Sequence, residues 1–298
     1  MMARARYSTS GPWFKGNTHI HTTKSDGGCD YAEVADLYAE RGYDFIFITD
    51  HNVAADVERM KLPLLGINGI EIDGTDRKGS YYHIVGLGVA KPLVPGMSLR
   101  EASFTKRLSM LKRSGAVTIL AHPHWTGNSV DEALRHGFDG VEVYNHVCNW
   151  LNGKCSGAFH WDCMLETQSD VLGFSVDDAH IKPAHPGYDG GWVMVQAPKL
   201  TRANIMRSIR AGRFYSTTGP LIRSLRATTK RVEVKCSPAK SIRLAGRRSS
   251  GQRVGAKGSK GLTKAVFDTD TQSPYMRLEV EGLDGKRAWT NCLFHRGV

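Results

Sequence analysis

Long apolar runs and paired cysteines are both missing from this chain of 298 residues, and each absence argues against a class of protein. The longest apolar runs, such as residues 45–48 and 119–121, are far shorter than the roughly 20 residues with which a helix crosses a bilayer, so no membrane span is predicted. The six cysteines include no C-x-x-C pair, which argues against a zinc ribbon or a redox motif. We expect reduced thiols, with one disulfide among Cys148, Cys155 and Cys163 as the alternative.

Acidic residues are scarce in the last third of the chain. Residues 201–298 contain 21 Lys and Arg against 6 Asp and Glu, a net charge of +15, whereas residues 1–200 contain 19 against 23, a net charge of −4. Histidine is distributed the other way, since eleven of the twelve precede residue 186. The basic N-terminus is not followed by the apolar segment of a secretory signal, so we expect a cytoplasmic protein.

Short apolar strands alternate with helix-like segments in the first 200 residues. Ser129 and Glu132 have the spacing of a capping box, which marks the start of one helix. Continuous apolar segments are typical of parallel strands that are covered on both faces. The alternation of strands and helices therefore predicts an α/β domain with a parallel sheet. The apolar segments span residues 44–49, 116–121, 140–144 and 171–176.

The pattern changes after about residue 220. Polar and apolar residues now alternate, as in half-exposed antiparallel strands, and turn residues such as Asp284-Gly285 separate the segments. We therefore predict two domains, an α/β domain over residues 1–221 and a small, basic, antiparallel β-sandwich-like module over residues 222–298. The alternating segments span residues 231–235, 241–245, 275–280 and 286–290.

Histidine and carboxylate residues follow almost every predicted strand of the first domain. Taken singly, each is explained as a polar residue of a turn or strand end, but the joint pattern is not. The C-terminal ends of parallel barrel strands converge on one face, so these side chains would share a centre. Nitrogen and oxygen ligands without a thiolate suit Zn²⁺, Mn²⁺ or Fe, and we predict a polynuclear metal site. The residues are His19, His21, Asp26, Asp50, His51, Glu71, His83, His122, His124, Glu142, Asp178 and His180.

Seven short motifs resemble, in order, those of the PHP (polymerase and histidinol phosphatase) superfamily. They are Thr18-His-Ile-His21, Ser25-Asp26-Gly27, Thr49-Asp-His-Asn52, Gly69-Ile-Glu71, Ala121-His-Pro-His124, Gly140-Val-Glu-Val-Tyr-Asn145 and Asp177-Asp-Ala-His180. The segments 213–220 and 287–291 are similar to a branch of predicted metal-dependent phosphoesterases that includes carbaryl-type carbamate hydrolases. The resemblance implies a distorted (β/α)7 barrel that holds two or three divalent metal ions.

The resemblance also implies how the ligands are shared. A first ion would take His19, His21, Glu71 and Asp178. A second would share Glu71 and take His83 and His122, and a third would take Asp26, His51 and His180. Asp26 stands where some relatives use histidine. Asp50 and Glu142 would orient ligand imidazoles and backbone.

Several divalent ions held in this way lower the pKa of bound water from about 15.7 to about 7 and stabilise growing negative charge. Because no Ser or Cys nucleophile motif occurs, we predict direct attack by metal-bound hydroxide on a small organophosphate mono- or diester. The candidates for substrate contact are His124, Asn52, Asn145 and Arg213. His124 could instead only line the pocket, and Arg213 could complement a helix dipole. Trp125, Trp150, Trp161 and Trp192 would wall the pocket or pack the barrel top.

Two other functions compete with this prediction. The same metal centre would also polarise a carbonyl group, so an aryl ester or carbamate hydrolase is the alternative. A third hypothesis is nucleic-acid binding by the basic module. Against it, few aromatic residues are interleaved with the charges, and single-strand binders need these for stacking on bases. We therefore expect a small anionic or aryl-ester substrate as the partner.

Overall fold

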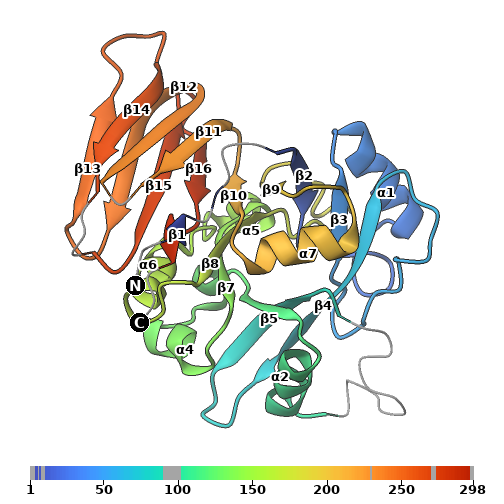
Figure 1. Ribbon diagram of the computed structural model, residues 1–298. Coiled ribbons are helices and arrows are strands. Elements are labelled where there is room, and N and C mark those ends of the chain that lie inside the picture. Colours follow the sequence, from blue (N-terminus) through green and yellow to red (C-terminus); the bar gives the residue numbers. More distant parts are fainter. Residues whose placement is uncertain are drawn as a thin grey trace.

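Seven strands lie side by side in one sheet, in the same order as in the sequence (Figure 1). The computed structural model describes residues 4–5, 7, 11–89, 102–228, 230–269 and 273–295. They are β2 (Trp13–Asn17), β3 (Phe45–Ile48), β4 (Leu65–Thr75), β5 (Tyr81–Leu87), β6 (Val117–Leu120), β7 (Gly140–Asn145) and β8 (Leu172–Val176). β2, β3 and β4 pair in parallel, and so do β6, β7 and β8. Between these groups β5 runs antiparallel to both neighbours.

Helices cover this sheet, as the alternating pattern predicts. All residues of β3 and β8 are buried, which is why their sequences are continuously apolar. α1 contacts β3, α2 contacts β4 and β6, and α6 contacts β7 and β8. A mixed α/β protein with a large sheet is therefore confirmed. The helices are α1 (Tyr31–Glu40), α2 (Phe104–Arg113), α3 (Pro123–Thr126), α4 (Val130–Arg135), α5 (His146–Asn152), α6 (Ala158–Thr167) and α7 (Arg202–Arg210).

The capping box predicted for α4 is present. The hydroxyl of Ser129 accepts a hydrogen bond from the backbone N–H of Glu132 at 3.2 Å, and the Glu132 carboxylate accepts one from the backbone N–H of Ser129 at 2.6 Å. These two bonds satisfy amide groups that the first turn of a helix otherwise leaves unpaired. They fix the start of α4.

A closed (β/α)7 barrel is not confirmed. β9 (Trp192–Gln196) lies antiparallel on the free side of β2, and β10 (Phe214–Thr217) is antiparallel to β9. Along the described strands no ladder joins β8 to β2; the two ends meet through a single parallel bridge between Ile20 and Ala179 and through side-chain bonds such as that from Asn17 to Asp177. A hairpin between β4 and β5 takes the place of one crossover helix, which breaks the regular alternation.

The last third of the chain is antiparallel, as predicted, but it continues the large sheet. β12 is long enough to pair with β11 and β14 through its first half and with β13 and β15 through its second. β16 then joins β15 to β10, so a separate sandwich is not shown. A domain boundary at 221/222 stays a prediction. These strands are β11 (Ile222–Ala227), β12 (Arg231–Gly246), β13 (Gly251–Gly255), β14 (Leu262–Asp268), β15 (Met276–Gly282) and β16 (Arg287–Thr290), and β1 (Arg4–Ala5) pairs with β17 (Phe294–His295).

A buried arginine links β15 to α6. The guanidinium of Arg277 donates to both carboxylate oxygens of Asp162, at 2.9 and 2.8 Å, and lies 4.9 Å from the ring centroid of Trp161. Trp161 is fully buried and donates its indole N–H to the carbonyl of Val171 at 3.0 Å. The C-terminal strands are thus fixed to the helix layer by a two-pronged ion pair over an aromatic ring.

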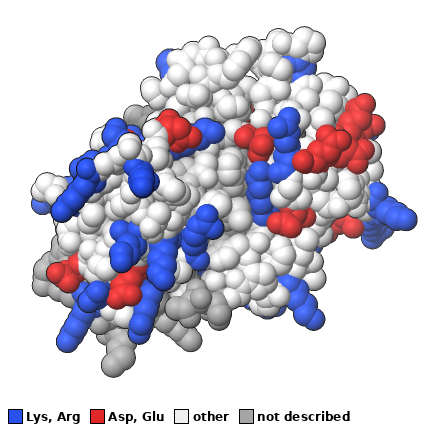
Figure 2. Space-filling model, turned by 90° about the horizontal axis from the view of Figure 1, so that it is seen from above, with Lys and Arg blue, Asp and Glu red and all other residues white. Residues whose placement is uncertain are grey.

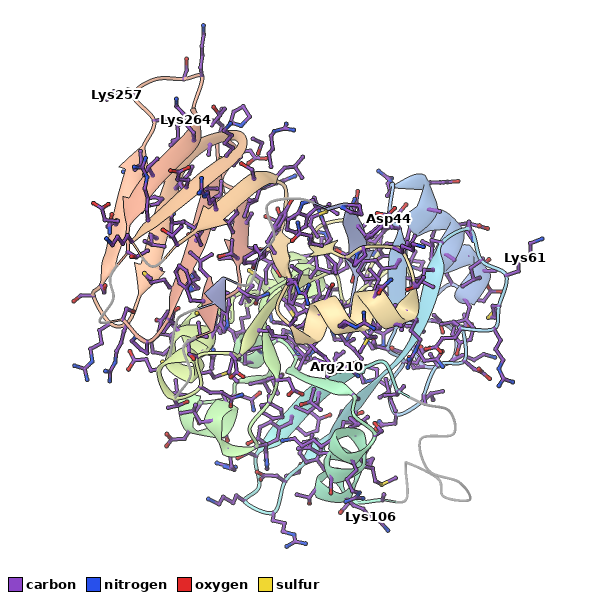
Figure 3. The ribbon with its side chains drawn as sticks, in the orientation of Figure 1. Asp44, Lys61, Lys106, Arg210, Lys257 and Lys264 are labelled. Atoms are coloured by element: carbon purple, nitrogen blue, oxygen red, sulfur yellow. The ribbon has the colours of Figure 1, made fainter. Side chains whose placement is uncertain are left out.

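The charge asymmetry of the sequence is visible on the surface. Lys and Arg side chains crowd the left part of the face in Figure 2, where the C-terminal strands lie, and the largest group of Asp and Glu lies on the right. Lys257 and Lys264 are exposed and project from the outer end of these strands (Figure 3). The basic residues are therefore spread over strands and turns rather than gathered in one helix.

Two predicted absences can be compared with the structure. Among the described helices, none is both long and apolar enough to span a membrane. All six cysteines are free thiols, so the alternative of a disulfide among Cys148, Cys155 and Cys163 is not realised.

Candidate metal centre

The predicted ligands meet at one end of the sheet. His19 and His21 follow β2, His51 follows β3, and Glu71 lies in β4. His83 lies near the start of β5, which is the correct end because β5 runs antiparallel to β4. Of the other predicted ligands, His122, Asp178 and His180 follow strands β6 and β8, and Asp26 lies between β2 and α1.

Four donor atoms form the buried centre of this cluster. The Nε2 atoms of His19 and His21 are 3.1 Å apart. The Glu71 carboxylate oxygen Oε2 lies 3.2 and 3.3 Å from these two nitrogens, and the Asp178 oxygen Oδ1 lies 3.3 and 3.0 Å from them. Ligands about 2.0–2.1 Å from a tetrahedral ion are about 3.3 Å apart, so these atoms have the spacing of a metal-binding quartet.

A second group surrounds the other oxygen of Glu71. Its Oε1 atom lies 2.8 Å from Nδ1 of His83 and 3.5 Å from Nε2 of His122. Nδ1 of His51 is 3.2 Å from Oε2 of the same carboxylate, so His51, Glu71 and His83 also form a compact group of donors. The structure thus brings His51 closer to the second group than the resemblance implies.

The third group gathers around Asp26 at the outer side. Asp26 Oδ2 lies 3.1 Å from Nε2 of His180, and Oδ1 lies 4.0 Å from Nε2 of His51 and 3.7 Å from Nδ1 of His21. The carboxylate is 46% exposed, unlike the quartet, and Lys182 Nζ is 3.3 Å from it. A neutral imidazole coordinates through one nitrogen, so His21 and His51 can each serve only one of the groups they adjoin.

Glu142 and Asn145 support the buried quartet. Glu142 Oε1 is 2.7 Å from Nδ1 of His19, and its Oε2 accepts the backbone N–H of His122 at 2.9 Å. The amide of Asn145 donates to Glu142 at 2.9 Å and to Asp178 at 3.1 Å, while its oxygen accepts the backbone N–H of Cys148 at the start of α5. This arrangement fixes the orientation of His19 and Asp178.

Asp50 acts on the backbone rather than on an imidazole. Its carboxylate accepts the backbone N–H and the hydroxyl of Thr22, each at 2.7 Å, and the hydroxyl of Ser25 at 2.7 Å. These bonds fix the turn that carries Asp26. Asp50 thus contacts backbone and hydroxyl groups of this turn, whereas Glu142 contacts the ring of His19.

The electrostatics of the quartet favour positive charge. Burial opposes protonation of His21, but hydrogen bonds to Asp178 and Glu71 outweigh it and raise its pKa to about 9. The pKa of His19 is raised too, since Asp178, Glu71 and Glu142 together outweigh the cost of burial. Burial alone would raise the pKa values of the Glu71 and Asp178 carboxyl groups, but the surrounding histidines outweigh this effect and lower them. Ionised carboxylates at full burial need a compensating cation, which a divalent ion can provide in place of protons.

Three ligand-bearing turns have unusual backbone. Asn52, His122 and Asp178 have positive φ angles of 55°, 25° and 55°. Such angles are uncommon for residues other than glycine and cost of order 1–3 kcal/mol each. At each of these three residues the chain leaves a strand and turns across the end of the sheet.

The predicted substrate contacts fare differently. Asn145 is buried among the ligands, and Asn52 sits at the edge, where its amide donates to Asp73 and accepts from Arg107. His124 is exposed on α3, and no described contact joins it to the cluster. Arg213 is displaced to the opposite end, because its carbonyl pairs with Gln196, which lies opposite the first residue of β2. The geometry therefore gives no support to substrate contact by His124 or Arg213.

Three residues near the ligands escaped the sequence reasoning. Asp73 lies 3.6 Å from Nδ1 of His51, and His51 and Asn52 lower its pKa to about 2. Asp73 could have been predicted to lie near the site, because it follows Glu71 by two residues on a strand and such residues share a face. Asp177 is fully buried and accepts from Tyr38, Asn17 and three successive backbone amides. His185 lines the cavity from a loop that has no strand pattern.

A cavity of about 170 Å³ opens onto the ligands. Of the four tryptophans, Trp125 lines it, and Trp150 lies 6.0 Å from the ring of His185 at its edge. Trp161 is buried in the helix layer, and Trp192 lies in β9 beside Lys15. The full lining is Asp26, His51, Glu71, His83, Trp125, Val147, Cys148, Leu151, Asp178, His180 and His185.

Comparison with known sequences gives a partial match. No family model matches the chain. A curated relative, the phosphoribosyl 1,2-cyclic phosphate 1,2-diphosphodiesterase of Eggerthella lenta, is 34% identical over 79 residues, which are 24% of this chain and 29% of the relative. The chain thus spans less than a third of the length of that relative.

Comparison with solved structures defines the fold class. A two-domain protein from Bacteroides vulgatus, which contains a predicted PHP-like metal-dependent phosphoesterase, aligns over 98% of both chains with a TM-score of 0.57 and 15% identity. The two proteins therefore share a fold. An amidohydrolase from Chromobacterium violaceum, with bound sulfate and no metal, covers 67% of this chain and 96% of its own, at 18% identity and a TM-score of 0.42.

Proposed function

We propose that this chain is a metal-dependent phosphoesterase of the PHP type that hydrolyses a small organophosphate mono- or diester. The observation that carries the proposal is the buried quartet of His19, His21, Glu71 and Asp178, whose donor atoms have the spacing of ligands around one ion. Further support comes from the fold shared with the Bacteroides protein and from the partial match to a cyclic phosphate diesterase.

The residues present fit two or three divalent ions such as Zn²⁺, Mn²⁺ or Fe²⁺, because their donors are nitrogen and oxygen with no thiolate among them. The quartet would hold one ion, and Glu71 with His83 and His122 a second. Asp26, His51 and His180 would hold a third. When bound, such ions supply an activated water and stabilise charge on a phosphoryl oxygen.

The other residues of the site hold the ligands in place for this reaction. Glu142 accepts the ring N–H of His19, which leaves Nε2 free to act as a ligand. Asn145 fixes the second oxygen of Asp178 through its amide. Lys182 beside Asp26 places a positive charge at the outer edge, where an anionic substrate enters.

An aryl ester or carbamate hydrolase is the alternative, since four of the eleven residues that line the cavity are apolar. We further propose that residues 1–221 contain the whole site and that residues 222–298 form a module attached to it, since all the ligands precede residue 181.

Metal content and substrate turnover test the proposal. The protein, purified without chelator, should contain at least one equivalent of transition metal, and it should hydrolyse p-nitrophenyl phosphate or bis-p-nitrophenyl phosphate. Glu71→Gln removes the carboxylate shared by two groups, so it should lower both metal content and turnover, the latter more than about 100-fold. Glu40→Gln, at the exposed end of α1, is the matched control.

Two results would overturn the proposal. One is less than one equivalent of metal together with no turnover after addition of Mn²⁺ or Zn²⁺. The other is turnover of an aryl carbamate with none of either phosphoester, which would establish the alternative.

A further inference from the structure

We infer that the alcohol part of the substrate is an uncharged, flat, apolar group that packs between Trp125 and Leu151. This inference rests on the proposed function, because it assigns the part of the ester that does not contact the ions. It follows from an asymmetry of the cavity. Candidate ligands and His185 line part of it, and the apolar side chains of Trp125, Val147, Cys148 and Leu151 line the rest.

Trp125 packs against the rings of two candidate ligands. Its ring lies edge-on to that of His122, with centroids 5.1 Å apart and an interplanar angle of 82°, and 6.1 Å from that of His83 at 75°. The side chain is nevertheless 39% exposed, which is unusual for a large aromatic group fixed so close to a buried centre. An aromatic ring with one face open beside a reaction centre is a ready platform for a flat ligand.

Helix α5 supplies the facing wall. Val147 and Cys148 are buried and close the floor of the cavity, while Leu151 is 40% exposed and reaches its mouth. Trp150, on the same helix, is 52% exposed, so apolar surface continues outward from the cavity. Solvent-facing apolar surface next to a polar centre indicates a ligand that covers it.

Charge and size exclude a polyanionic alcohol. Among the described residues, no Lys or Arg lines the cavity. Lys182, which adjoins the lining residue Asp26, already donates to the backbone carbonyl of Asp26 at 2.6 Å and pairs with its carboxylate at 3.3 Å. A second phosphate group would therefore meet no unpaired cation among the described residues that line the cavity. A volume of about 170 Å³ is also below the roughly 300 Å³ at which drug-sized ligands are enclosed, so a single ring fits better than a nucleotide.

Two esters with leaving alcohols of similar acidity test the inference. The metal-loaded protein should have a kcat/KM at least about ten-fold higher for 2-phenylethyl phosphate than for 2-hydroxyethyl phosphate. Trp125→Ala should abolish most of this preference by raising KM for the phenyl ester, with little effect on the hydroxyethyl ester. Trp125→Phe should retain it. Phe159→Ala is the matched control, because Phe159 is an aromatic residue that is 70% exposed and does not line the cavity.

A binding measurement separates this inference from the proposed function. Calorimetric titration of the metal-loaded protein should show tighter binding of phenylphosphonate than of methylphosphonate, and Trp125→Ala should remove the difference. If that holds while no phosphoester is hydrolysed, the proposed function fails and the apolar wall stands. If both esters are hydrolysed equally well and both phosphonates bind equally, the inference is overturned and the proposed function stands.

Discussion

Glu142 shows how much a single residue outside the ligand set contributes to this centre. Its two oxygens contact the His19 ring, the His122 backbone and the Asn145 amide, and its side chain is buried. Without it, His19 could present either ring nitrogen to the centre, and two buried N–H groups would lose their acceptor.

We therefore expect Glu142→Gln to lower the affinity for the first ion about 10- to 100-fold while the fold is retained. Competition with a chromogenic chelator measures the affinity, and circular dichroism checks the fold. Asp131→Asn, on the exposed start of α4, controls for the loss of a negative charge. Equal metal affinity of Glu142→Gln and the unaltered protein would show that Glu142 does not position His19.

At the scale of elements, ion pairs between β12 and β15 give the C-terminal strands a dependence on pH. Glu281 accepts from Arg243 at 2.5 Å and lies 3.1 Å from Nζ of Lys240. These two cations lower the pKa of the Glu281 carboxyl from 4.5 to about 2. A pKa that is lower in the folded than in the unfolded state stabilises the protein above the unfolded value, and the contribution is lost as pH falls through the folded value.

The variant Glu281→Gln should therefore reduce the free energy of unfolding at pH 7 by about 1 kcal/mol or less, since Arg243 is a third exposed. The difference from the unaltered protein should shrink between pH 4.5 and pH 2. Urea unfolding at several pH values measures it, with Glu233→Gln as a more exposed control on β12. A difference that is constant with pH would contradict the assignment.

The site residues show which parts of the structure can be predicted from local sequence patterns and which cannot. The sequence places most candidate ligands at strand ends, and the structure has them there, because apolar runs and the polar residues after them are local patterns. The sequence pattern also puts His124 on the same face as His122, because residues two apart on a strand share a face. That expectation holds only if the strand continues beyond His122. His122 instead has a φ of 25° and the chain turns into α3, so His124 points outward. Arg213 fails for a different reason, since only the long-range pairing of β10 with β9 decides which end of the sheet it occupies.

At the scale of the whole molecule, Arg277 and Asn291 join the basic strands to the rest. Asn291 accepts the backbone N–H of Gly173 at 2.9 Å and donates to the carbonyl of Phe214 at 3.0 Å, so it connects β8 and β10 with the C-terminal segment. Together with the Arg277–Asp162 pair, these bonds couple the C-terminal strands to the strands behind the site. The sequence motif at 287–291 thus has a structural explanation that its composition does not reveal.

We expect Arg277→Met to lower the free energy of unfolding by about 1–3 kcal/mol, because it removes two charge-assisted bonds while Asp162 remains partly exposed. Calorimetry should show a single transition at lower temperature if the two parts unfold together. Two transitions would show that residues 222–298 unfold as a domain of their own. Arg231→Met, at an exposed pair on β12, should leave the transition temperature nearly unchanged.

The amide of Asn145 has a consequence for how the specificity of this protein can change. Its nitrogen donates to Asp178, and its oxygen accepts the backbone N–H of Cys148 at the start of α5, the helix that carries Leu151. The helix and the proposed ligand Asp178 are therefore held by the same side chain. Moving α5 to admit a larger substrate would therefore displace a ligand. Substrate range can be widened without that cost only by exchanging side chains on a helix that stays in place, as at positions 147 and 151.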